Sequence, residues 1–109
     1  MPGTVSTLGL VAVVTGLVAG LAVVGGAVLT AERMAGTADA AALAAADAAS
    51  GAVPGVPCDE AARIAEAGEA SLRECSVEGL VATITVGGAY GGISFDARSR
   101  AGPPERSSP

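Results

Sequence analysis

Two cysteines, Cys58 and Cys75, are the side chains of this 109-residue sequence with the most distinctive chemistry. The sequence contains no His, so neither a Ser-His-Asp triad nor a Cys-His pair can form, and two Cys alone supply too few ligands for a structural zinc site. We therefore expect a protein that is not an enzyme and that binds neither a cofactor nor a metal ion.

A disulfide between Cys58 and Cys75 is the chemistry that remains. An even pair of cysteines in a small exported segment most often forms a disulfide. Such a bond would close a loop of 16 residues between the two cysteines. Closing a loop of this size stabilises the folded state by about 3 kcal/mol in the chain-entropy model. The alternative is a pair of free, buried thiols in a cytosolic tail. A disulfide predicts that the C-terminal part of the chain lies outside the cytoplasm.

Composition limits the partners and the core. The chain is 50% hydrophobic, 2% aromatic and 16% charged, with a net charge of −5. Six Arg, no Lys and eleven acidic residues argue against a nucleic-acid partner, because phosphate binding requires an excess of basic side chains. Most apolar residues are Ala and Val, so a small soluble part would have a thin core and would need a disulfide, a membrane or a partner for stability.

The charged residues are absent from the first part of the chain. No charge occurs between Pro2 and Ala31, and about 20 apolar residues suffice to cross the hydrocarbon core of a bilayer. After a short N-terminal segment, residues 1–7, we predict a transmembrane helix over residues 8–31 that contacts membrane lipid. The alternative is a cleaved secretory signal, but the apolar region of a signal spans only about 7–15 residues and follows basic residues. Arg33 is the only basic residue near the span, and by itself it weakly favours the opposite orientation.

A stripe of small residues lies within the predicted span. Gly16 and Gly20 form a GxxxG pattern, and Ala12 continues it by one turn. Such a stripe allows two helix backbones to approach closely, so it predicts a contact with another membrane helix or self-association. In a chain this rich in Gly and Ala, the alternative is that composition alone produces the spacing.

Beyond the span, residues 32–51 continue the helical pattern as an Ala-rich extension. Its acidic residues fall near one side, and the opposite side is smooth and suited to packing against other helices. This side comprises Met34, Ala38, Ala41, Ala42, Leu43, Ala45 and Ala49. Ser50 and Gly51, followed by Pro54, Gly55 and Pro57, end the helix.

Residues 52–101 are predicted to form a small extracytoplasmic head beyond this rod. A short helix begins at Cys58, and two strand-like runs, 73–77 and 80–86, flank a turn at Glu78-Gly79. Residues 87–92 read as a flexible glycine-rich link to a third strand over 93–98, and 102–109 read as a disordered tail. The expected fold is a membrane-anchored α+β protein. Its long N-terminal transmembrane and amphipathic helix precedes a disulfide-linked helix and a three-stranded antiparallel sheet, with Phe95, Ile64, Ile84 and Leu72 as core candidates.

These features resemble a known family. A segment with Gly3, a membrane helix rich in Gly, Ala, Val and Leu, and the string TADAAALAAADAA resemble the TadE/TadG-like proteins of the tight-adherence (Flp) pilus-assembly system. The repeat from Ala38 to Ala46 is its most specific part. The placement of the two cysteines and the ARSRAGP that closes the last strand resemble short actinobacterial TadE-like proteins of helicase/secretion neighbourhoods, and the resemblance extends over residues 3–103.

The resemblance implies a pilin-like, single-pass protein of the cell membrane with an outward head and no catalytic residues. Such a protein would assist the assembly or anchoring of a pilus or a related secretion apparatus, with other membrane proteins of that apparatus as partners. Two other functions remain open. One alternative is a small exported protein released by signal cleavage to act as a ligand or effector. The other is a membrane subunit of a secretion complex unrelated to pili.

Overall fold

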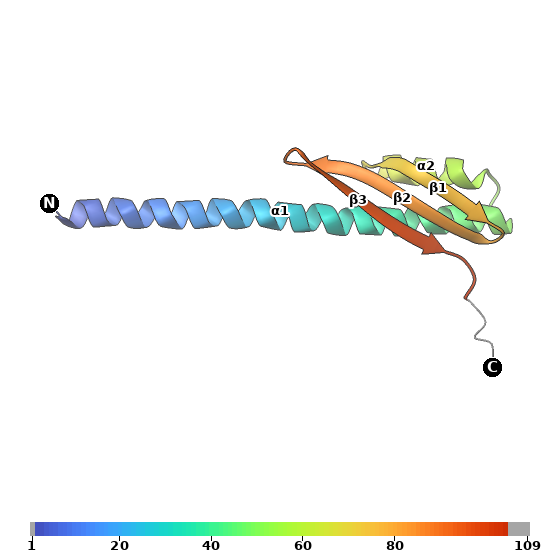
Figure 1. Cartoon of the computed structure of the whole chain (residues 1–109), viewed down its shortest axis with the longest axis horizontal. Helices are drawn as coiled ribbons and strands as arrows, with labels where there is room; N and C mark the ends of the chain where they lie inside the picture. Colours follow the sequence, from blue (N-terminus) through green and yellow to red (C-terminus); the bar gives the residue numbers. More distant parts are fainter. Residues whose placement is uncertain (1, 105–109) are drawn as a thin grey trace.

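One helix sets the length of the molecule. The computed structural model describes residues 2–104, and helix α1 runs without interruption over Pro2–Ser50 (Figure 1). Its 49 residues correspond to about 74 Å at 1.5 Å per residue, which matches the 75 Å longest dimension of the molecule. Alanine is the strongest helix former, and no proline follows Pro2 until Pro54, so nothing in the sequence interrupts the helix before its predicted end.

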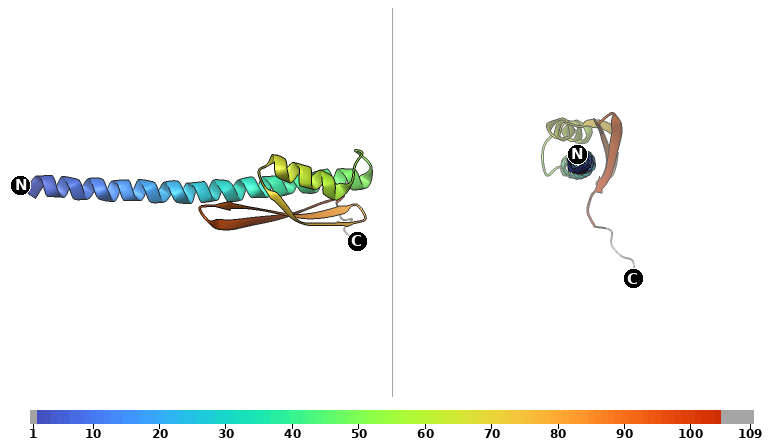
Figure 2. Two further views of the ribbon diagram at one scale, coloured as in Figure 1. Left: turned by 90° about the horizontal axis from the view of Figure 1, so that it is seen from above. Right: turned by 90° about the vertical axis from the view of Figure 1, so that its left-hand side faces the viewer.

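The chain reverses direction after α1. Gly51 takes a positive φ of 79°, and helix α2 follows over Pro57–Ala67 beside the C-terminal half of α1 (Figures 1 and 2). Proline suits the first turn of a helix because the amide hydrogen it lacks would have no helical partner there. Asp59 and Glu60 lie in the same turn, where negative charge complements the helix dipole. The predicted break between two helices is thus confirmed.

Three antiparallel strands complete the fold as predicted. Strands β1 (Ser71–Glu78), β2 (Val81–Tyr90) and β3 (Ile93–Ala101) form one sheet in sequence order. A bulge interrupts the pairing of β1 with β2 between Leu72 and Glu74. Both helices pack on the same side of the sheet, as the end-on view in Figure 2 shows.

The prediction of a flexible link over residues 87–92 is wrong. Gly87 to Tyr90 belong to β2, and only Gly91 and Gly92 form the turn to β3. A Cβ atom at Gly88 would collide with the side chain of Met34 on α1, and one at Gly87 would collide with the side chains of Arg73 and Asp96. Gly87 and Gly88 are therefore part of a strand that closely approaches its neighbours. This close approach explains why glycine, a residue with low strand propensity, occurs there.

The head lies beside the C-terminal half of α1 rather than beyond its end (Figure 1). Ile84 and Val86 of β2 are the largest fully buried side chains, and the period-two pattern predicted for this strand is observed. Ile64, Leu72 and Phe95, the other core candidates, are half-buried against the same cluster. The buried cluster comprises Met34, Ala38, Ala41, Ala42, Ala45, Ala61, Ala65, Ala70, Ala82, Ile84 and Val86.

The two ends of the described chain differ in structure. Residues 2–7 belong to α1 rather than to a separate segment, and Met1 lies outside the described residues. Gly102 to Pro104 follow β3 without helix or strand and are exposed. The remainder of the tail predicted to be disordered, residues 105–109, also lies outside the described residues.

Candidate membrane anchor and disulfide-linked head

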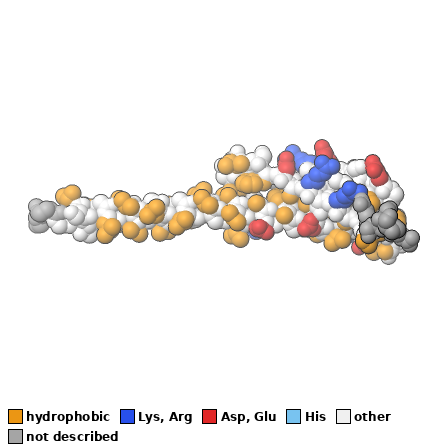
Figure 3. Space-filling model, turned by 60° about the horizontal axis from the view of Figure 1, so that its bottom comes forward, with side chains coloured by type: hydrophobic (Ala, Val, Ile, Leu, Met, Phe, Trp, Pro, Cys, Tyr) orange, Lys and Arg blue, Asp and Glu red, His pale blue; other side chains and the backbone are white. Residues whose placement is uncertain are grey.

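The N-terminal half of α1 is an apolar surface that no other part of the described chain covers. Every residue from Gly3 to Gly25 is exposed, and Leu17 and Val18 are each 62% exposed. These 23 residues extend over about 35 Å, slightly more than the roughly 30 Å hydrocarbon thickness of a bilayer. Figure 3 shows charged side chains over the head and the adjoining half of α1, and none on the uncovered N-terminal half of the helix. Within the described chain, α1 is the helix that is long and apolar enough to cross a membrane.

The predicted packing stripe lies on this exposed surface. Gly16 and Gly20 are four residues apart, and Ala12 lies one turn earlier, so the three share one face of α1. A Cβ atom at either glycine would meet nothing within 4 Å among the described residues outside the helix's own backbone. The face is therefore accessible to another helix, and the contact itself stays a prediction.

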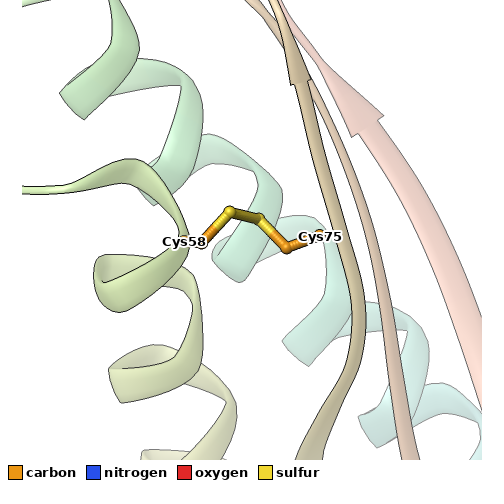
Figure 4. The surroundings of a disulfide bond; sticks show 2 residues. All are labelled: Cys58 and Cys75. Atoms are coloured by element: carbon orange, nitrogen blue, oxygen red, sulfur yellow. A yellow bond between two sulfur atoms is a disulfide. The ribbon is translucent and has the colours of Figure 1, made fainter.

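The predicted disulfide is present. Cys58 in the first turn of α2 bonds to Cys75 in the middle of β1, and their Cα atoms are 5.9 Å apart (Figure 4). Both residues are half-buried, and Cys75 packs against the core. The disulfide attaches the short helix α2 to β1, an edge strand of the sheet. The core is built mainly from alanine, whose small side chains contribute little to holding these elements together.

Three close approaches join the head to α1, and none of them was predicted from the sequence. Each pairs a glycine with a side chain from another element: Met34 with Gly88, Thr37 with Gly68, and Gly26 with Tyr90. A Cβ atom at Gly68 would lie 2.5 Å from the Thr37 hydroxyl oxygen. A glycine within a strand or just after a helix indicates that another part of the chain approaches the backbone closely. The sequence therefore marks these positions, but it does not show which residue makes the approach.

Two polar contacts add to this joint. The Ser99 hydroxyl of β3 donates a hydrogen bond to a carboxylate oxygen of Asp39 on α1, with 2.5 Å between the two oxygens. Arg33 of α1 lies 3.5 Å from the Glu69 carboxylate after α2, an exposed pair that contributes little to stability. The smooth side of α1 predicted to pack against helices is thus occupied by α2 and by the sheet of the same chain. Leu43 is 58% exposed and lies outside the buried cluster.

The polar surface of the sheet shows no arrangement typical of a reaction centre. Ser76, Glu78, Thr83, Arg98 and Arg100 line an open hollow on the side of the sheet away from α1. Across residues 2–104, no three His, Cys, Asp or Glu side chains come together as metal ligands would. The exposed apolar helix and the cross-linked head attached to it are the features from which a function can be argued.

Comparisons with protein-family models, curated proteins and solved structures found no match. The resemblance to TadE-like proteins thus rests on the motifs in the sequence, and the function has to be argued from the geometry of this chain.

Proposed function

We propose that the chain is a single-pass membrane protein with its head on the outer side of the cell membrane. In this proposal it is a TadE-like, pilin-like component that assists the assembly or anchoring of a tight-adherence pilus or a related secretion apparatus. The continuity of α1 is the observation that supports this proposal most directly. The same helix supplies an uncovered apolar half, 3–25, and part of the buried core of the head.

This continuity favours a positioning role. A helix shared by the membrane and the head leaves no loop between them, so the head keeps a defined distance from the bilayer surface. In this proposal the head contributes a surface. Such a construction suits a protein that presents a folded surface to neighbouring proteins at a membrane.

The disulfide supports the outward orientation. Disulfides persist in oxidising compartments and are rare in the cytosol. Cys58 and Cys75 lie on the C-terminal side of the apolar segment, so an oxidising environment for this pair supports a cytoplasmic location for the N-terminus of α1.

The structure gives less support to release by cleavage. A cut between residues 31 and 36 would separate the head from Gly26, against which Tyr90 packs. A cut after Met34 would also remove a buried core side chain. The released head would therefore lose part of its own packing surface.

Deletion of the gene in its host, followed by complementation, tests the proposed role. We expect deletion to reduce surface filaments seen by negative-stain electron microscopy, or proteins secreted into the medium. Wild-type protein and Val18→Leu should restore them, whereas Val18→Arg should not, because a charge at the centre of the span costs about 2.5–3.5 kcal/mol on insertion scales. Unchanged filaments and unchanged secretion after deletion would reject the role in assembly.

Orientation is tested separately in intact cells. Without reductant, the two thiols should resist alkylation, and after reduction both should react. Labelling of both thiols without reductant would contradict the outward location of the head.

A further inference from the structure

The β2–β3 hairpin extends beyond the rest of the head. β1 pairs with β2 only as far as Ser71 opposite Gly87, whereas β2 and β3 continue to pair until Tyr90 opposite Ile93. Figures 1 and 2 both show the end of this hairpin reaching along α1 toward its N-terminus, past α2 and β1. We call residues 88–95 the hairpin tip.

The hairpin tip has an unusual composition for this chain. It carries no charged residue, and it contains both aromatic residues of the sequence, Tyr90 and Phe95. Ile93 at its end is 63% exposed. A two-stranded ribbon is only marginally stable in water by itself, so an uncharged ribbon with an exposed Ile gains from contact with a further apolar surface.

Its position along α1 indicates what that surface is. A Cβ atom at Gly26 would overlap the end of the Tyr90 side chain, so the hairpin tip lies at the level of Gly26. This level immediately follows the uncovered segment 3–25, whose length matches the bilayer core. It also precedes the first charged residue, Glu32, by six positions, or about 9 Å along the helix. The hairpin tip thus reaches the boundary where the apolar helix would leave the bilayer.

We propose that the hairpin tip inserts into the outer interface of the membrane, with Tyr90 at the level of the lipid headgroups and Ile93 facing the acyl chains. Tyrosine is enriched at this depth because its ring is apolar and its hydroxyl is polar. This inference rests on the proposed membrane span of α1. It gives the head two contacts with the bilayer, the helix and the hairpin tip. A lipid surface fits better than a second protein copy because the hairpin tip is continuous with the apolar surface of α1.

The single tyrosine provides a direct test. The chain has one Tyr and no Trp, so the intrinsic fluorescence of the full-length protein reports Tyr90 alone. The protein is reconstituted into phosphatidylcholine vesicles, with either ordinary acyl chains or acyl chains brominated near the headgroup. We expect a roughly twofold loss of Tyr90 emission in the brominated vesicles, since a tyrosine at the interface lies close to the first acyl carbons.

A matched control moves the tyrosine to the opposite end of the sheet. Leu80 lies near Leu43 and Ser50, and Ser50 is about 36 Å along α1 from the level of Gly26. In the variant Tyr90→Phe/Leu80→Tyr, bromination should leave the emission unchanged. Equal emission loss for the two proteins, or no loss for either, would overturn the proposal.

Substitution of Ile93 separates insertion from mere proximity. Ile93→Asp should abolish the emission loss of Tyr90, whereas Ile93→Val should retain it. A Tyr90 signal that changes with the protein-to-lipid ratio but not with bromination would indicate a second copy on the hairpin tip and would overturn the proposal. Flotation of the same vesicles tests the span separately. Protein that floats without bromine quenching refutes the hairpin contact alone, and protein that does not float refutes both the contact and the proposed anchor.

Discussion

Removal of the Cys58–Cys75 disulfide should unfold the head while leaving the chain in the membrane. The cross-link joins positions 17 residues apart. By lowering the entropy of the unfolded chain, a cross-link that closes a loop of this size stabilises the folded state by about 3 kcal/mol. The buried core it supports consists mainly of alanine, with Ile84 and Val86 as its largest fully buried side chains. Because small domains are stable by only a few kcal/mol, we expect Cys58→Ala/Cys75→Ala to remove most of the stability of the head.

Trypsin digestion across a series of urea concentrations measures this effect in detergent-solubilised, full-length protein. The chain has no Lys, and Arg63 and Arg73 lie inside the disulfide-closed loop, so cleavage there reports unfolding of the head. Samples are reduced before electrophoresis, because the disulfide would otherwise hold the fragments together. For a head of this size, with an m-value of about 1 kcal/mol/M, the midpoint of protection should fall by about 2–3 M urea.

Two controls determine the interpretation. Wild-type protein digested in the presence of reductant should behave like the double variant, and both should still fractionate with membranes through α1. An unchanged midpoint in the double variant would refute the reasoning that the cross-link compensates for a thin core.

Three further substitutions test other parts of the structure. Val18→Arg should reduce the fraction of protein that resists carbonate extraction, because the charge makes insertion less favourable by about 2.5–3.5 kcal/mol. Val18→Leu should leave this fraction unchanged. Replacement of Gly16 and Gly20 by Leu should weaken helix association measured by energy transfer between labelled chains in vesicles, and unchanged transfer would show that the stripe reflects composition alone. Ala41→Leu should destabilise the head by about 1–3 kcal/mol in the urea and trypsin assay, because the residue is fully buried, whereas the exposed Ala40→Leu should have little effect. Equal midpoints for these two variants would contradict the packing of α2 and the sheet on α1.

Local signals in the sequence were sufficient for the break between the helices, the alternation in β2 and the cysteine pair. The break after Ser50 follows from glycine and proline, whose backbone restrictions act wherever they occur. The alternation in β2 fixes which of its residues face the core, because side chains alternate across any strand. The disulfide could be assigned from the sequence because the chain has two cysteines, so each has one possible partner.

The arrangement of the elements depends on contacts that the sequence does not name. An alanine-rich helix face packs equally well against a helix, a sheet or another protein, so Ala38 and Ala45 did not reveal that the head folds back along α1. Gly87 and Gly88 favour loops by propensity, and only the nearby Met34 and Arg73 side chains explain their place in a strand. The position of Tyr90 beside Gly26 is likewise a tertiary contact between residues far apart in the chain.

In the proposed membrane orientation, the continuous helix α1 also acts as a lever. Transmembrane helices tilt by about 20° on average, and the tilt depends on bilayer thickness and on neighbouring helices. Residues 26–50 extend about 37 Å above the uncovered segment, so a tilt of this size displaces the far end of the head sideways by about 13 Å. A thinner membrane or a new helical neighbour would thus change the lateral reach of the head without any change in its internal structure.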